Sequence, residues 1–435
     1  MSSHAFSITD PRREFALEVV RRLRDAGFDS LWAGGCVRDQ LLGKEPKDYD
    51  VATSALPQEV IRLFGEDRTV PVGAAFGVVM IPGPTRRHGQ VEVATFRSDG
   101  EYLDGRRPES VQFCSAEEDA RRRDFTINGM FFDPLAEKVL DYVGGQEDLQ
   151  RRIIRAIGDP HTRFGEDHLR MLRAVRFAAT FSFTLDTDTL RAVQDLRNRI
   201  EGVSVERTMQ ELRRMLAHPS RAAALRLLQQ SLLLPEILPE VSAHIADPPQ
   251  FAELCRMFEG LESVHFEPAL ALLLRPLHEL TLPEARQRLQ AIHAICRRLK
   301  MANAEIDCVS WILESLPTLR HIASRPLHVL KPLLADHRAP LLLSASAATD
   351  AGSGSPAEDA AFAWHYLSRT SPAQLNPPPL ISGDDVQKMG VPPGPRIRQI
   401  LTAVRDAQLD EHLENREAAL NMARQLAGPQ TQDPA

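Results

Sequence analysis

The chain has 435 residues, 43% of them hydrophobic, and a formal net charge of −7. Its length allows two to four domains, and its hydrophobic content is enough for each to have a sizeable core. No apolar run approaches the ~20 residues that cross a bilayer, the N-terminal stretch lacks the apolar segment of a signal peptide, and the five scattered cysteines form no CxxC pair. We therefore expect a cytoplasmic protein with no membrane partner, no disulfide framework and no zinc ribbon.

The N-terminal third has a mixed pattern. Asp10 and Pro11 are typical of a helix start, and Gly27 is typical of its end. Helical pieces at 35–43 and 57–64 alternate with β-like runs at 30–35, 48–53, 68–72, 76–82 and 91–97. These elements predict a small mixed α/β domain that ends between residues 133 and 143.

From about residue 146 the apolar period becomes helical, and no β-hairpin signal follows. A small, polar stretch at 346–358 predicts a mobile surface loop, and residues 427–435 predict a disordered tail. Helices are expected at 165–182, 187–200, 205–217, 220–231, 250–262, 267–278, 284–299, 303–315, 359–369, 383–389 and 394–425.

The most informative segment is 34–50, GGCVRDQLLGKEPKDYD. Gly34 and Gly35 predict a tight turn with free backbone N–H groups. Asp48 and Asp50 alternate at the start of a strand, so both carboxylates project to the same face. Such charges repel unless a cation lies between them. A phosphate cradle beside a divalent-metal site indicates phosphoryl or nucleotidyl transfer; the alternative is a strand cap and a surface residue.

Glu92 lies in a run of alternating residues, between Val91 and Val93 on the opposite face. A third carboxylate from a neighbouring strand would complete a metal-binding set with Asp48 and Asp50. The alternative is an ordinary exposed glutamate.

The negative net charge does not exclude nucleic-acid binding, because positive charge can be concentrated locally. Only six of the 52 basic residues are Lys, and Arg clusters lie at 121–123, 151–155 and 163–176. In RRRDFTINGM, Arg123 is placed to pair with triphosphate oxygens. Asp124 and Asn128, four apart on an expected helix, would share a face and engage ribose hydroxyls. The alternative is a basic surface helix.

In EDHLRMLRAVRF, Asp167 and Arg170 are neighbours at i, i+3, and Arg173 and Arg176 continue at that step. Cytosine and adenine each present an amine donor beside a ring-nitrogen acceptor, whereas uracil and guanine present a carbonyl beside an N–H. A carboxylate and a guanidinium therefore fit C and A and mismatch U and G. The alternative is a row of salt bridges on an exposed face.

With these motifs, the chain resembles the class II tRNA nucleotidyltransferase and bacterial poly(A) polymerase family. The resemblance implies an α+β architecture: a nucleotidyltransferase head (1–143), followed by an all-α neck (144–203), body (204–345) and tail (359–426). It implies that Asp48, Asp50 and Glu92 hold two Mg²⁺. It further implies nucleotide-binding roles for Gly34, Gly35, Arg38, Arg123, Asp124, Asn128, Asp167, Arg170, Arg173 and Arg176.

The resemblance also bears on the product. Segment 96–113 is similar to the flexible loop of full CCA-adding enzymes, and 71–81 lacks the basic signature of poly(A) polymerases. Both favour the addition of C, C and A to the 3′ end of tRNA from CTP and ATP. A poly(A) polymerase, an A-adding enzyme and a non-catalytic RNA-binding relative stay open, as does the oligomeric state.

Overall fold

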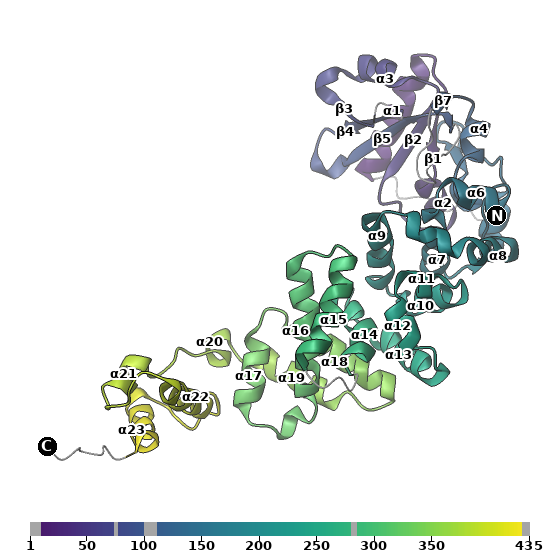
Figure 1. Ribbon diagram of the computed structural model, residues 1–435. Coiled ribbons are helices and arrows are strands. Elements are labelled where there is room, and N and C mark those ends of the chain that lie inside the picture. The colour runs from purple at the N-terminus through teal and green to yellow at the C-terminus, as the bar shows by residue number, and fades with distance from the viewer. Residues whose placement is uncertain (1–9, 74–76, 100–110, 280–284, 429–435) are drawn as a thin grey trace. The chain divides into compact units, whose positions relative to one another are not determined.

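The computed structural model describes residues 10–73, 77–99, 111–279 and 285–428 (Figure 1). The chain divides into two compact units, one formed by residues 1–215 and 223–239 and the other by 216–222 and 240–435. All described strands belong to the first unit, so the expected order of a mixed α/β head before a helical remainder is confirmed. The finer boundaries near 143, 203 and 345 stay predictions. No described helix is long and apolar enough to cross a membrane.

A seven-stranded mixed sheet, in the order β3-β4-β5-β2-β1-β8-β9, forms the centre of the head. Strands β2 and β5 run parallel, and the other neighbouring pairs are antiparallel. The strands are β1 (Ser30–Ala33), β2 (Tyr49–Thr53), β3 (Val70–Gly73), β4 (Val78–Pro82), β5 (Gln90–Thr95), β8 (Phe131–Asp133) and β9 (Lys138–Leu140). A separate antiparallel pair joins β6 (Arg97–Asp99) to β7 (Val111–Phe113).

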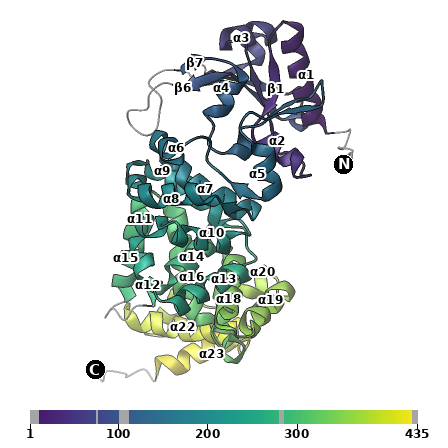
Figure 2. The ribbon, with the colours of Figure 1, turned by 90° about the vertical axis from the view of Figure 1, so that its right-hand side faces the viewer.

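The two faces of this sheet have different neighbours. Helices α1 (Pro11–Asp25) and α3 (Pro57–Phe64) lie together against one face (Figure 2). Trp32 is buried there, 4.8 Å from the Tyr49 ring. On the other face, Leu31, Ala52 and Phe131 form an apolar cluster with α4 (Ala116–Arg121). Side chains alternate between these faces along each strand.

The helices after the sheet differ from their predicted bounds at one functional point. The helix expected over 165–182 is two helices, because Asp167 has an extended backbone (φ −144°, ψ 104°) that ends the first of them. The helices are α5 (Gly145–Arg151), α6 (Pro160–Glu166), α7 (Leu169–Phe181), α8 (Thr187–Leu196), α9 (Val205–Leu216), α10 (Arg221–Gln230) and α11 (Leu233–Ile237). The pattern also missed a parallel pair, β10 (Ile153–Ile154) and β11 (Thr184–Leu185), whose strands are too short to show a period.

The second unit consists of packed helices in its described part, and it corrects the loop expected at 346–358. Residues 346–353 instead belong to α18, which packs on α13. A Cβ on Gly352 would lie only 2.3 Å from Met257 Cγ, so small residues permit close helix packing here. The helices are α12 (Pro239–His244), α13 (Pro248–Gly260), α14 (Phe266–His278), α15 (Ala285–Arg298), α16 (Asn303–Leu319), α17 (Leu327–Ala335), α18 (Ala339–Ser353) and α19 (Glu358–Arg369).

The C-terminal helices form their own apolar cluster, which includes Val386, Ile400 and Ala419. They are α20 (Pro372–Leu375), α21 (Gly383–Gln387), α22 (Pro395–Leu409) and α23 (Arg416–Ala427). The single helix expected over 394–425 is wrong, because the chain turns at Glu411, which has a left-handed φ of 66°. The predicted disordered tail lies, from residue 429, outside the described residues, as do positions 100–110 of the loop-like segment 96–113.

Candidate active site

Asp50 and Glu92 are direct partners on two parallel strands. In the pairing of β2 with β5, Asp50 lies opposite Glu92 and Ala52 lies opposite Ala94. Partners in a sheet present their side chains on the same face, so both carboxylates share the face of Ala52. Asp48 immediately precedes β2 and is close enough to influence the Asp50 carboxyl group. Asp50 and Glu92 thus share a face, as the sequence predicts. The face of the Asp48 side chain and the role of the three carboxylates stay predictions.

The electrostatics of the carboxylates favour a cation. Desolvation and the charges of Asp48 and Glu92 raise the pKa of Asp50 to about 6, against the opposing effect of Arg123. A divalent cation would relieve this repulsion, and carboxylate oxygens are ligands that Mg²⁺ prefers. No three His, Cys, Asp or Glu side chains among the described residues already form a ligand cluster. The carboxylates therefore fit a cation by charge and donor type, and would have to converge on it.

Gly34 and Gly35 form the expected turn between β1 and α2 (Gly35–Leu41). Gly34 has φ 70° and ψ −121°, and its N–H donates to the Met130 carbonyl oxygen at 3.2 Å. A Cβ at this position would lie 2.9 Å from Arg123 Nη1. The turn thus brings the Arg123 guanidinium against the backbone at the N-terminus of α2.

Asp124, Asn128 and Arg38 form one buried hydrogen-bonded chain. Asn128 Nδ2 donates to Asp124 Oδ1 at 3.1 Å, and Arg38 Nη1 donates to Asn128 Oδ1 at 2.6 Å. Asp124 Oδ2 accepts two bonds from Arg173, at 2.8 and 2.6 Å. Burial alone would raise the pKa of Asp124, but Arg173 and Asn128 together hold it below its ordinary value. The expected helix here is wrong, since only a 3₁₀ turn (Thr126–Asn128) forms, yet the two side chains meet.

Arg123 is fixed by a buried carboxylate that the sequence argument missed. Asp119 accepts bonds from Arg123 Nε and Nη2, at 3.1 and 3.0 Å, and from Arg122 Nε at 2.8 Å. Burial opposes the charge on Asp119, but the two guanidinium groups outweigh it and lower the pKa. The i, i+4 spacing of Asp119 and Arg123 on a helical stretch was the available signal.

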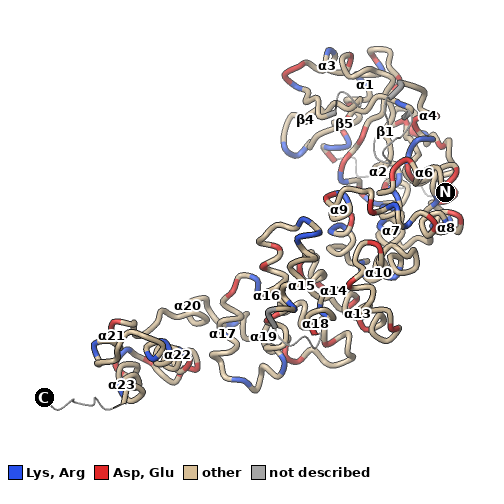
Figure 3. The backbone as a smooth tube through the Cα atoms, viewed as in Figure 1, with Lys and Arg blue, Asp and Glu red and all other residues tan. Residues whose placement is uncertain are grey.

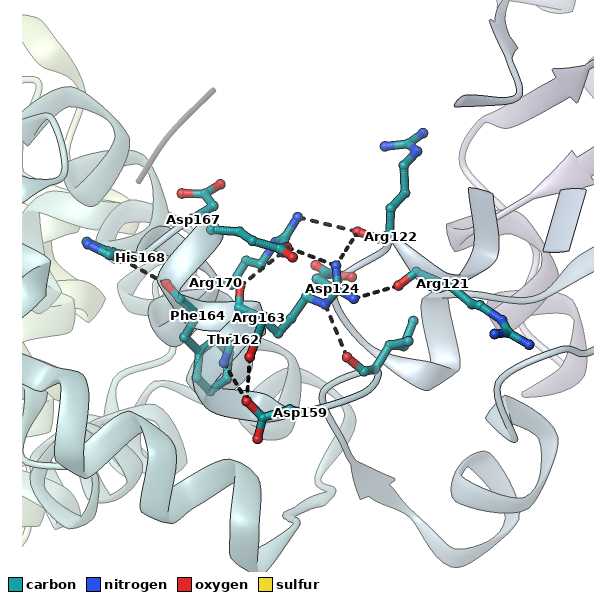
Figure 4. A network of polar contacts seen from close by, with 12 residues as sticks. Arg121, Arg122, Asp124, Asp159, Thr162, Arg163, Phe164, Asp167, His168 and Arg170 are labelled. Carbon is teal, nitrogen blue, oxygen red and sulfur yellow. Dashed lines mark hydrogen bonds and ion pairs between the residues drawn. The ribbon is translucent and has the colours of Figure 1, made fainter. Parts of the chain in front are cut away.

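The Asp167 and Arg170 side chains bind other residues and not each other, although the Arg170 backbone N–H donates to the Asp167 carbonyl oxygen at 3.0 Å. Arg207 Nη2, from α9, donates to Asp167 Oδ2 at 2.7 Å. Arg170 is buried, and its Nη1 donates to Glu166 Oε2 at 2.5 Å. In Figure 4 the Asp167 carboxylate points away from the network around Arg170 and Arg163. The side chains expected to select a base are therefore near each other in the chain but held by separate partners.

Arg173 and Arg176 gather with Arg38 around one aromatic ring. The three guanidinium carbons lie 5.2, 4.1 and 5.5 Å from the centre of the Phe177 ring. Arg176 also pairs with the buried carboxylate of Glu211, which no local pattern indicated. Figure 3 shows basic and acidic segments alternating around α4, α6, α7 and α9. These arginines thus belong to a neutralised network that joins α7 to the turn after β1.

Comparison with known proteins gives two family matches. A family described as the poly A polymerase head domain matches residues 31–155. A family described as the probable RNA and SrmB-binding site of polymerase A matches residues 182–245. Among curated relatives, a CCA-adding enzyme of Geobacillus kaustophilus is 35% identical over 407 residues, covering 93% of this chain and 95% of the relative. A CCA-adding enzyme of Bacillus subtilis is 43% identical over 223 residues, covering 51% of this chain and 55% of the relative.

Solved structures give the same picture. The crystal structure of the Bacillus stearothermophilus CCA-adding enzyme in complex with CTP has a TM-score of 0.75 and 30% identity, covering 96% of this chain and 99% of the other. A Thermotoga maritima CCA-adding enzyme complexed with tRNA has a TM-score of 0.66 and 19% identity, covering 95% of each chain. The latter likeness concerns the fold alone.

Proposed function

Since this chain belongs to the family of CCA-adding enzymes, we propose that it adds C, C and A to the 3′ end of tRNA. The substrates are CTP and ATP, pyrophosphate is released, and no nucleic-acid template is read. The observation that carries this proposal is the pairing of Asp50 with Glu92 on one face of the sheet, beside the Gly34 turn and Arg123.

Asp48, Asp50 and Glu92 are proposed to hold Mg²⁺ in a two-metal site. When bound there, the cations would neutralise triphosphate charge and favour deprotonation of the attacking 3′-hydroxyl. The support for this assignment is the mutual repulsion that raises the pKa of Asp50 to about 6 after desolvation. Arg38, Arg123 and the backbone N–H group at Gly35 would orient the triphosphate, since guanidinium groups and helix N-termini bind phosphate well. Gly34, whose own N–H donates to the Met130 carbonyl oxygen, would let the turn approach the triphosphate closely.

Asp124 and Asn128 are proposed to engage the ribose, whose hydroxyls would compete with the bonds that these side chains now share. Asp167 and Arg170 are proposed to read the base. Asp167 accepts from the exocyclic amine of C or A, and Arg170 donates to the neighbouring ring nitrogen. Because an unsatisfied buried group costs ~1–3 kcal/mol, U and G are disfavoured. Arg173 and Arg176 hold this site in place through Asp124 and Glu211.

The tRNA is proposed to be bound by shape and backbone contacts, because A-form helices expose little sequence to a protein. Residues 182–245, which match the RNA-binding family, and the helices that follow them are the proposed surface. A cytoplasmic location is proposed from this substrate and from five cysteines that are all free.

The direct test is to incubate the purified protein with Mg²⁺ and tRNA that lacks its 3′ CCA, giving CTP and ATP singly and together, and to sequence the products. We expect C-C with CTP alone and C-C-A with both nucleotides. A ladder of A residues would favour a poly(A) polymerase, and A only on tRNA that ends in CC would favour an A-adding enzyme. No turnover at all would contradict catalysis.

The same assay tests the metal assignment. Asp48→Ala and Asp50→Ala are expected to abolish addition while the circular dichroism spectrum and melting temperature stay close to those of the unsubstituted protein. Full activity of either variant would contradict the assignment of these carboxylates as metal ligands.

A further inference from the structure

Arg163, in the last turn of α6, is not among the residues proposed to contact the nucleotide, yet its guanidinium makes four hydrogen bonds. Nε donates to the Ile157 carbonyl oxygen at 3.1 Å. Nη1 donates to the Arg122 carbonyl oxygen at 3.1 Å and to Glu166 Oε2 at 2.9 Å. Nη2 donates to the Arg121 carbonyl oxygen at 2.7 Å. The side chain is 14% exposed. Arg163 is thus bound mainly to backbone (Figure 4).

Three of the four acceptors adjoin the two segments that are proposed to bind the nucleotide. The carbonyls of Arg121 and Arg122 come immediately before Arg123 and Asp124, the residues assigned to the triphosphate and the ribose. Glu166 comes immediately before Asp167 and also binds Arg170. One rigid planar group therefore spans from the segment that holds the sugar and phosphates to the turn that reads the base.

A second contact strengthens the same connection. Arg170 Nη1 donates to the Arg163 carbonyl oxygen at 3.0 Å, and Arg170 Nη2 lies 3.4 Å from the Arg122 carbonyl oxygen. Displacement of the Arg163 side chain would therefore remove one of the two guanidinium groups that hold the Arg122 carbonyl oxygen and the Glu166 carboxylate. Both of these fix Arg170 directly.

We propose that Arg163 is a positioning residue for base selection, which touches no nucleotide and fixes residues 121–124 at a set distance from Asp167 and Arg170. This inference rests on the proposed function. Discrimination depends on that distance, because a wrong base is rejected only if its mismatched groups are held against the carboxylate and the guanidinium. A misplacement of about 1 Å is enough to cost about 100-fold in a positioned reaction.

The test is a competition assay on tRNA lacking its 3′ CCA, which measures U against C incorporation and, on tRNA ending in CC, G against A. For Arg163→Met we expect both ratios to rise about tenfold or more relative to the unsubstituted protein. For Arg163→Lys, which keeps the charge but cannot reach all of these acceptors at once, we expect a smaller rise. A variant that folds poorly has fewer active molecules, which lowers the incorporation of C, U, A and G by the same factor. The two ratios therefore measure how the base is positioned and not how much protein is folded.

Two arginines provide controls. Arg155 joins Asp148 and Asp186 in the same unit, at 3.1 and 2.6 Å, so Arg155→Met should lower the melting temperature without changing the ratios. Arg191 pairs with the exposed Asp188 at 3.2 Å, so Arg191→Met should change neither.

Unchanged ratios in Arg163→Met, or in Arg163→Lys if the Met variant does not fold, would overturn the inference. So would an equal relaxation in Arg155→Met, because selection would then fail with any loosening of the fold. If the unsubstituted protein itself adds no C or A, the proposed function fails; if it adds and selects them while Arg163→Met selects equally well, only this inference fails.

Discussion

Gly34 combines two features that a side chain would disturb. Its φ of 70° is in the left-handed region that favours glycine, and a Cβ would lie 2.9 Å from Arg123 Nη1. We expect Gly34→Ala to lower the free energy of unfolding by ~1–3 kcal/mol, through backbone strain. It should also displace Arg123 and weaken CTP binding. Urea unfolding and isothermal titration calorimetry measure the two effects.

The matched control is Gly144→Ala. Gly144 also has a left-handed φ, 79°, but nothing lies within 4 Å of the position of its Cβ. This variant should be strained and yet bind CTP normally. If Gly34→Ala bound CTP as tightly as the unsubstituted protein, the contact with Arg123 would have no part in nucleotide binding.

Asp167 and Arg170, which we propose to read the base, should contribute separately to base choice, because each side chain is held by its own partner. We expect Asp167→Ala or Arg170→Ala to relax selection toward U and G by about 10- to 100-fold, corresponding to ~1–3 kcal/mol for one unsatisfied group. Incorporation from an equimolar mixture of four nucleotides measures this. A variant that still excluded U and G would show that the base is read elsewhere.

Several site residues could be predicted from the sequence because their spacing alone places them together. Asp48 and Asp50 are two residues apart where a strand begins, and Gly34 and Gly35 permit a tight turn. By contrast, Glu211 is 35 residues from its partner Arg176, and Arg207 is 40 residues from its partner Asp167. No periodic pattern in the sequence predicts these two ion pairs, because they depend on how α9 packs against residues 167–176.

At the scale of elements, α4 supplies a buried ion-pair cluster with a defined pH dependence. Asp119 is 1% exposed, and its pKa lies below the ordinary value because Arg123 and Arg122 outweigh the effect of burial. The unfolded chain has the ordinary pKa of ~3.9 and so binds the proton more readily. The stability that Asp119 contributes is therefore complete above about pH 4 and is lost as the pH falls through the lower, folded value.

Accordingly, Asp119→Asn should destabilise the protein by ~3–5 kcal/mol at pH 7, because it leaves two arginines without their buried partner. The difference from the unsubstituted protein should shrink as the pH falls below about 4. Urea unfolding at pH 7, 5 and 3.5 measures it. Asp188→Asn, in an exposed pair, is the control and should have little effect. A difference that did not change with pH would contradict the ion-pair assignment.

The helices show which parts of a fold a sequence pattern predicts. Long amphipathic runs, such as α9 and α14, lie within a residue or two of their expected ends. The predicted helix bounds are wrong at α18, whose small residues are also typical of a loop. They are also wrong at Asp167 and Glu411, where a helix ends although neither residue is Gly or Pro. Close helix packing and the contacts that hold a break are tertiary effects, so a local pattern cannot contain them.

At the scale of the whole molecule, we expect the proposed cations to be needed for the reaction and not for folding. The sheet and helices have apolar cores of their own, as in the cluster of Leu31, Ala52 and Phe131. We expect EDTA to abolish addition and to lower the melting temperature by at most a few degrees, since only the binding free energy of the cations is lost. Added Mg²⁺ should restore activity. Cooperative unfolding in EDTA would show that the metal is structural.

The parallel pairing of β2 with β5 also limits how the chain can change in length. A strand that gains or loses one residue turns every following side chain to the opposite face. A single insertion between Tyr49 and Asp50, or between Val91 and Glu92, would therefore send one carboxylate toward α1 and leave the other behind. Insertions and deletions that preserve function should be confined to the connections between these strands. A deletion scan of the head would find its least tolerant positions within β2 and β5.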